Sequence, residues 1–148
     1  MLDPYELVGL ARKHGGKSSV PTGALIGLEA VAAAAEGTIP SVKMVTRKPV
    51  CGLVGAPFLE QNGLRIEDIA TPLRIFSGTV REAAKGFSAN LNVAVALALA
   101  GAGPDETMLE IWADPVLTRN THTIVVAADA ASFSMTIENI PSENPKTS

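Results

Sequence analysis

The spacing of apolar and polar positions over the first two thirds of the chain mainly predicts helices. The segment DPYE at residues 3–6 supplies a helix cap, a first-turn proline and an acidic residue, so a helix is expected from there to the glycines at 15–16. Residues 22–37 are rich in helix formers and place apolar side chains on one face. Residues 79–86 and 88–102 predict two consecutive helices, and the second is apolar nearly all round, so it should be buried.

Strand-like patterns are concentrated in the last third of the chain. Three segments there are rich in β formers: residues 107–113, 121–128 and 132–138, with a turn at 129–130 between the last two. Earlier in the chain, residues 39–48 alternate in part and end at Pro49, which predicts a strand. A short strand is also expected at residues 17–20, and an ordered loop at 49–63.

Helices early in the chain and strands late in the chain predict an α+β fold. We expect a mainly antiparallel or mixed sheet with helices packed on one face, in which the three late strands pair antiparallel as neighbours. The 148 residues lie in the usual range of one domain, and 47% hydrophobic residues are enough for a core. We therefore expect residues 1–148 to form a single domain.

Composition and charge exclude several classes of partner. The formal net charge of −3 comes from scattered acids and bases without a basic stripe, so nucleic acid is not expected as a partner. The most apolar stretch, residues 93–102, is too short to cross a bilayer. The single Cys51 cannot form an internal disulfide, the Cys and His spacing offers no metal site, and the first residues do not resemble a signal peptide. We expect a cytoplasmic protein.

One of the two histidines is a candidate for chemistry. His14 lies at the end of the first predicted helix, where a cap or a solvated side chain is the simple interpretation. His122 lies in the polar run TRNTHT at residues 118–123, a few residues after Asp114. From spacing alone, a polar hairpin connection is the favoured interpretation of this run. Imidazole nevertheless titrates near neutral pH, so a positioned His122 can move a proton to or from an amine or a water molecule.

Three further segments have polar or small residues where a ligand could bind. Asn90 and Asn92 begin an apolar helix, where amides either cap the backbone or bond a ligand. Small residues at 20–27 allow close approach at a predicted strand-to-helix junction. The segment TRKP, at 46–49, holds two cations that either lie in solvent or meet carboxylates. The chain has no Ser/His/Asp pattern, no phosphate-binding loop and no GxGxxG.

Taken in order, several segments resemble the C-terminal part of L-aspartate dehydrogenases. The matching segments are VPTGALIGLEAV, VKMVTRKPV, FSGTVREAAKGFSANLNVAVALALAGAGP, WADPVLTRNTHTI and IENIPSENPKTS, which together span residues 20–148. The resemblance implies a two-domain enzyme with an N-terminal domain that binds NAD or NADP. The C-terminal domain of that family supplies the substrate pocket and subunit contacts, which implies a homo-oligomer.

The resemblance also assigns candidate residues. It matches His122, in TRNxH, with the family's active-site histidine, and it matches Ala24 and Asn92 with residues that contact the nicotinamide cofactor. Oxidation of L-aspartate would give iminoaspartate and then oxaloacetate and ammonia, in NAD biosynthesis. The two substrate carboxylates need cations or donors, and Arg119, Lys48 and Lys146 are the candidates.

The sequence departs from the family pattern at several points. Ser88 stands where the family commonly has proline, a change that affects the entry to the helix. The resemblance implies that a nucleotide-binding half is missing before Met1 and that the chain of the family normally continues beyond Ser148, so the chain alone is expected to bind NAD weakly and to lack activity. Two alternatives stay open: an inactive binding or oligomerisation module, and a related dehydrogenase for another amino acid.

Overall fold

The computed structural model describes residues 4–16, 25–87 and 91–139. Its five strands form one sheet in the order β2-β3-β1-β4-β5. The strands are β1 (Ser41–Pro49), β2 (Leu73–Thr79), β3 (Thr107–Asp114), β4 (Thr121–Ala127) and β5 (Ser132–Glu138). The helices are α1 (Pro4–Lys13), α2 (Leu28–Ala34), α3 (Pro57–Gln61), α4 (Val80–Ala84) and α5 (Asn92–Ala100), with a short 3₁₀ turn, η1 (Val50–Gly52).

Strand β1 occupies the centre of the sheet. It pairs parallel with β3 on one side and antiparallel with β4 on the other. Antiparallel partners complete both edges, since β2 pairs with β3 and β5 pairs with β4. The fold is therefore α+β with a mixed sheet, as the order of helical and strand-like segments predicts.

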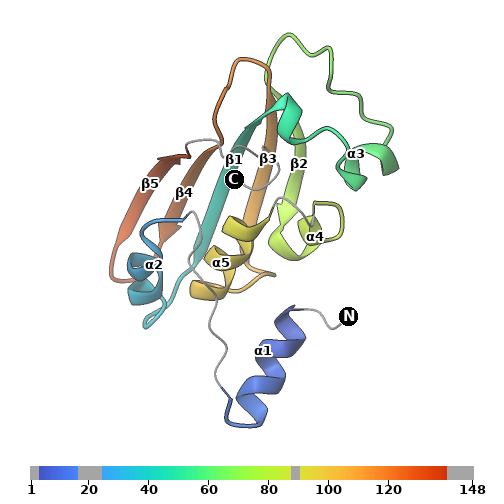
Figure 1. Ribbon diagram of the computed structural model, residues 1–148. Coiled ribbons are helices and arrows are strands. Elements are labelled where there is room, and N and C mark those ends of the chain that lie inside the picture. The colour runs from blue at the N-terminus through green and yellow to red at the C-terminus, as the bar shows by residue number, and fades with distance from the viewer. Residues whose placement is uncertain (1–3, 17–24, 88–90, 140–148) are drawn as a thin grey trace.

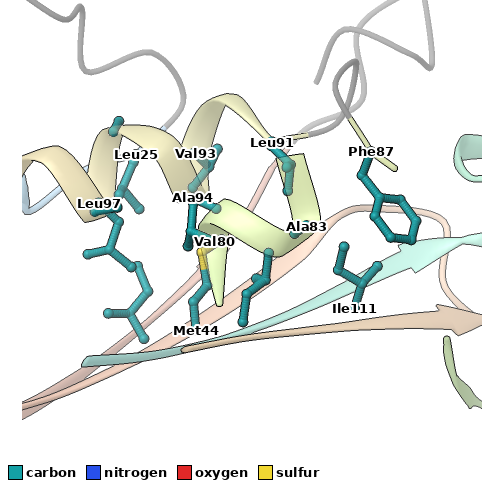
Figure 2. Close-up of a cluster of buried hydrophobic side chains, with 14 of the residues drawn as sticks. Leu25, Met44, Val80, Ala83, Phe87, Leu91, Val93, Ala94, Leu97 and Ile111 are labelled. Atoms are coloured by element: carbon teal, nitrogen blue, oxygen red, sulfur yellow. The ribbon is translucent and has the colours of Figure 1, made fainter. Parts of the chain in front are cut away.

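One face of the sheet carries the helices and the hydrophobic core. Helices α2, α4 and α5 lie on the same side of the sheet (Figure 1). Figure 2 shows Leu97 of α5 and Val80 of α4 above Met44 of β1, and all three side chains are buried. The sequence of α5, NVAVALALA, consists of apolar residues after its first position, and five of them are buried. This confirms the prediction of a buried helix.

The opposite face of the sheet holds a network of charged groups. Glu110 on β3 forms ion pairs with Lys43, at 2.8 Å, and with Arg74, at 3.7 Å. The guanidinium of Arg47 lies over the side chain of Trp112, on the same strand as Glu110, with its Cζ atom 5.1 Å from the centroid of the Trp112 ring. Alternation along β3 and β4 also places the apolar residues Met108 and Val125 on this face, where they are 43% and 48% exposed. We call this surface the open face.

The largest error of sequence interpretation concerns the pairing of the late strands. β3 and β4 were expected to be antiparallel neighbours, but β1 lies between them. The short connection after Asp114 therefore crosses the end of β1 instead of forming a hairpin, and pattern alone does not record which strand comes between two others. The predicted turn between β4 and β5 is confirmed, with Ala128 N donating to Ala131 O at 2.9 Å.

Several boundaries also differ from the prediction. Of the helix expected from residue 22, the described part (residues 25 onward) becomes helical at Leu28, because Gly27 has a left-handed φ of 90° that a helix cannot continue through. The predicted loop at 49–63 contains η1 and α3. Strand β2 was not predicted, because a register shift between Arg74 and Phe76 interrupts its alternation.

Two helices begin and end close to where the sequence places them. α1 ends at Lys13, before the glycine pair. α4 starts after a capping box, in which Thr79 Oγ1 accepts from Glu82 N at 3.2 Å and Glu82 Oε2 accepts from Thr79 N at 2.8 Å. The strand predicted at 17–20 and the cap predicted at Ser88 lie outside the described residues. Within the described ranges, no helix has the length and apolar character needed to span a bilayer.

Candidate functional site

The helix-covered face of the sheet changes from apolar to polar toward the end of β1. Alternation of this strand places Val42, Met44, Thr46 and Lys48 on that face, all of them buried. The first two pack in the core, and the last two bring a hydroxyl and an amine to the sheet's polar end. Arg47 points to the open face, so the two cations of TRKP are separated. Of these two cations, Lys48 alone lies beneath the helices.

His122 lies beside this polar end of β1. The antiparallel register of β1 and β4 places His122 directly opposite Thr46. The Nδ1 atom of the imidazole is 3.2 Å from Thr46 Oγ1, and the residue is 3% exposed. The Nε2 atom is also buried but has no hydrogen-bond partner among the described residues. A buried polar atom without a partner is costly, so this nitrogen is a candidate for contact with a ligand.

Burial and charge keep the imidazole neutral. Removal from water lowers the pKa of His122 to about 4, and the nearby positive charge of Lys48 contributes to the same shift. Burial also lowers the pKa of Lys48 to about 8. At neutral pH the site therefore combines an uncharged imidazole with an amine that is still mostly protonated, a base beside a cation.

Two asparagines extend the polar end across the neighbouring strands. Asn120 is buried just before β4, and Asn139 follows the end of β5. The backbone oxygen of Asn120 accepts a hydrogen bond from the backbone nitrogen of Asn139 at 2.9 Å. The burial pattern of β5 places Ile137 on the covered face, and alternation puts Asn139 on the same side. Its amide Nδ2 is buried without a hydrogen-bond partner in the described part of the chain. Within the described residues, the covered face thus has a second buried polar atom without a partner, just beyond the strand that pairs with β4.

The connection between β3 and β4 is anchored by Asp114. Its carboxylate accepts from Val116 N at 3.1 Å and forms an ion pair with Arg47 at 3.6 Å. Both contacts hold the start of the loop that leads to His122. Arg119, in the same loop, is exposed, and the structure does not place it with the buried pair of His122 and Lys48.

The cofactor candidates are only partly described. Asn92 is the first residue of α5 and its side chain is exposed. In Figure 2 the end of α5 at Leu91 lies on the same side of the view as Ile111. Ile111 pairs with Thr46 on β1, so this end of the helix lies toward the polar end of the sheet. Ala24 and Lys146 lie outside the described residues. Among the residues that are described, no cluster of three or more His, Cys, Asp or Glu side chains is suited to a metal ion.

Comparison with known proteins gives this site a family context. Residues 29–148 match the family model described as aspartate dehydrogenase, C-terminal. The chain belongs to this family. The resemblance noted in the sequence, and the assignment to a C-terminal domain, are therefore confirmed.

Similar proteins in the aspartate dehydrogenase family extend beyond this chain. It is 67% identical over 147 residues to an L-aspartate dehydrogenase of Bradyrhizobium diazoefficiens, covering 99% of this chain and 52% of that protein. It is 62% identical to L-aspartate dehydrogenase 3 of Bordetella bronchiseptica, covering 99% and 54%. A crystal structure of aspartate dehydrogenase from Thermotoga maritima superposes with a TM-score of 0.70 at 26% identity, covering 91% and 52%. The chain thus spans about half the length of these relatives.

Two polar residues of the site were not singled out by sequence interpretation. Thr46 was noted only within the predicted strand, the TRKP segment and a segment that resembles the family, and Asn139 only within the segment IENIPSENPKTS. Both become candidates through strand pairing. Thr46 lies opposite His122 on the neighbouring strand, and the backbone of Asn139 forms a hydrogen bond with that of Asn120. The available signal for Thr46 was a polar residue that follows two apolar residues, Val42 and Met44, on one side of an alternating strand.

The lowered pKa of His122 predicts a specific dependence of stability on pH. Between pH 4 and 6.5 the unfolded chain binds a proton at this residue that the folded chain does not. The free energy of unfolding therefore falls as pH falls from 6.5 to 4, by up to about 3 kcal/mol from this residue. His122→Gln should flatten the curve over this range in urea unfolding. His14→Gln, at the exposed end of α1, is the control, and an equally steep curve for His122→Gln would contradict the assignment.

Proposed function

We propose that this chain is the substrate-binding and catalytic part of an NAD(P)-dependent L-aspartate dehydrogenase that acts in the cytoplasm. The reaction converts L-aspartate into iminoaspartate, which water converts into oxaloacetate and ammonia, as a step toward NAD biosynthesis. The complete active site requires a nucleotide-binding domain in addition to residues 1–148. The names of the family and of the similar proteins support the class of reaction.

The observation that carries this proposal is the buried Nε2 atom of His122. It has no hydrogen-bond partner in the described part of the chain, whereas Nδ1 is supported by Thr46. An imidazole held at one nitrogen and open at the other is the arrangement that proton transfer requires. The low pKa of His122 keeps this nitrogen available to accept a proton at neutral pH.

In the proposed reaction His122 handles two protons. A hydride leaves the Cα atom only when the amino group is neutral, so Nε2 first takes a proton from the substrate ammonium. A bound nicotinamide supplies the hydride acceptor. The lone pair of the neutral amine forms the C=N bond as the hydride leaves. After His122 has released that proton to solvent, it takes a proton from the water that adds to this bond and returns it to the nitrogen. Ammonia then departs as the carbonyl forms and the hydroxyl proton passes to solvent.

Lys48 is the residue that we assign to a substrate carboxylate. It is buried beside His122, and at pH 7 its amine is still mostly protonated. Asn139 offers an amide donor on the same face. Such charged and neutral donors together suit a carboxylate. Arg119 and Lys146 remain further candidates for the second carboxylate, Arg119 from the exposed loop and Lys146 from a segment outside the described residues.

Asn92 and Ala24 are the residues that we assign to the cofactor. Asn92 fits this role because its exposed amide, in the first turn of α5, can both donate and accept hydrogen bonds outside the helix. A choice between NAD and NADP depends on the nucleotide-binding domain.

Replacement of His122 tests the assignment of the base. In the complete enzyme, His122→Ala should lower kcat for aspartate oxidation by about 10²- to 10⁴-fold, the range typical of a lost general base. Steady-state rates are measured by the formation of reduced nicotinamide at several pH values. His14→Ala, at the exposed end of α1, is the matched control and should keep the original rate.

The same assay separates the proposal from its alternatives. Activity that returns only when the nucleotide-binding domain is supplied, in trans or by fusion, supports an incomplete catalytic domain. A reconstituted enzyme that remains active after His122→Ala, with the original pH profile, would show that His122 is not the base. Preference for another amino acid would overturn only the choice of substrate.

Lys48 should affect both substrate binding and the imidazole. In Lys48→Met, loss of a charge-assisted hydrogen bond should raise KM for aspartate by about tenfold or more. The acidic limb of the kcat/KM profile should move to higher pH, because the positive charge that lowers the pKa of His122 is gone. Lys43→Met is the control from the same strand, since Lys43 pairs with Glu110 on the open face. An unchanged KM in Lys48→Met would exclude the carboxylate role.

We also propose that the chain forms a homo-oligomer through the open face. Helices α2, α4 and α5 lie on the other side of the sheet (Figure 1), and Met108 and Val125 on the open face are large, apolar and partly exposed. Val125→Glu should lower the mass measured by sedimentation to that of a single chain. Val116→Glu, 80% exposed in the loop after β3, is the control that should keep the original mass. An unchanged mass in Val125→Glu would place the subunit contact elsewhere.

A further inference from the structure

Among the described residues, the hydroxyl of Thr46 is the polar side-chain group that forms a hydrogen bond with the candidate base. Its Oγ1 atom lies 3.2 Å from His122 Nδ1, and the two residues are 4% and 3% exposed. They sit directly opposite each other on β1 and β4, two central strands of the sheet. The backbone pairing itself brings the two side chains together, because opposite residues of an antiparallel pair have neighbouring Cβ atoms.

A neutral imidazole carries one proton, on either Nδ1 or Nε2, and the partner of each nitrogen determines which form is stable. A threonine hydroxyl can accept from Nδ1–H or donate to a bare Nδ1, so the contact alone fits both tautomers. The reacting partner decides between them. A substrate ammonium has only protons to offer, so the nitrogen that meets it must present a lone pair.

We propose that Thr46 is a positioning residue that accepts a hydrogen bond from Nδ1–H of His122 and thereby keeps the Nε2 lone pair directed at the substrate amine. This inference rests on the proposed function. Nε2 is the nitrogen without a partner in the described structure, so it is the one left for the amine. Lys48, the charged neighbour that acts on His122, disfavours a second proton on the ring and so keeps one nitrogen bare.

The surroundings of His122 support a fixed ring orientation. On the covered face its strand neighbours are Ile124 and Asn120, and its partner on β5 is Ile137. Ile124 is fully buried, and apolar packing on that side leaves little room for the ring to turn. Thr46 therefore supplies the polar contact that determines which edge of the ring faces the protein and which faces the ligand.

Two substitutions in the complete enzyme separate the hydroxyl from the shape of Thr46. Thr46→Val keeps the branched shape and removes the hydroxyl, and it should lower kcat by about tenfold to hundredfold while KM for aspartate changes less than about twofold. Thr46→Ser keeps the hydroxyl and should regain most of the rate. The control is Thr38→Val, an exposed threonine in the connection between α2 and β1, and it should leave kcat unchanged.

A spectroscopic measurement tests the tautomer without reference to activity. With ¹⁵N-labelled histidine, the His122 signals are those missing from His122→Gln. Nδ1 should be protonated in the original protein and in Thr46→Ser, whereas Thr46→Val should show Nε2–H or a mixture of both forms. An original protein with Nε2–H would overturn the proposal, as would a Thr46→Val variant with the original kcat and tautomer.

The remaining outcomes also decide whether the hydroxyl of Thr46 has the proposed role. Equal loss of kcat in Thr46→Val and Thr46→Ser, with the original tautomer in both, would mean that packing and not the hydroxyl matters, which overturns the proposal. If the complete enzyme does not oxidise aspartate at all, the proposed function fails. The NMR comparison of the three forms of residue 46 then still supports or overturns the role of Thr46 in selecting the tautomer, so the two failures are distinguishable.

Discussion

The alternation of side chains along β1, at the centre of the sheet, is the constraint on which the site depends. It sends Thr46 and Lys48 beneath the helices, while Arg47 between them stacks on Trp112 at the open face. The antiparallel register with β4 then places His122 opposite Thr46. A slip of one residue would move His122 to the open face, where it would lose both its burial and its contact with Thr46. The chemistry of the site is thus determined by strand pairing.

The apolar part of the same face is what fixes this register. Val42 and Met44 on β1 lie opposite Val126 and Ile124 on β4, and all four are almost fully buried. Their burial stabilises one pairing strongly, because each side chain contributes about 1.5 to 3 kcal/mol when removed from water. That surplus offsets the cost of placing an imidazole and an amine in a dehydrated environment, where the charged form of each is disfavoured. Polar groups at one end of the face therefore depend on apolar groups at the other.

Local patterns predicted the elements better than their arrangement. A predicted cap located α1, the pattern of residues 79–86 located α4, and apolar composition predicted the burial of α5, because these signals act within a few residues. The placement of β1 between β3 and β4 has no local signal, since it depends on which strand inserts between two others. The same limit applies to the site. His122 and Lys48 were identifiable as ionisable residues, whereas the pairing of Thr46 with His122 follows only from a register that joins residues 76 positions apart.

The low pKa of His122 creates an apparent conflict with its proposed role, because a base with a pKa of about 4 takes a proton from an ammonium group poorly. Two causes act here: burial comes first and the charge of Lys48 second. A dicarboxylate bound beside Lys48 opposes the second cause directly and, by adding negative charge in a dehydrated site, also favours the protonated imidazole. The pKa of His122 then rises only when the dicarboxylate is bound. A monocarboxylate would supply less of this effect, so discrimination between substrates would occur in the proton-transfer step as well as in binding.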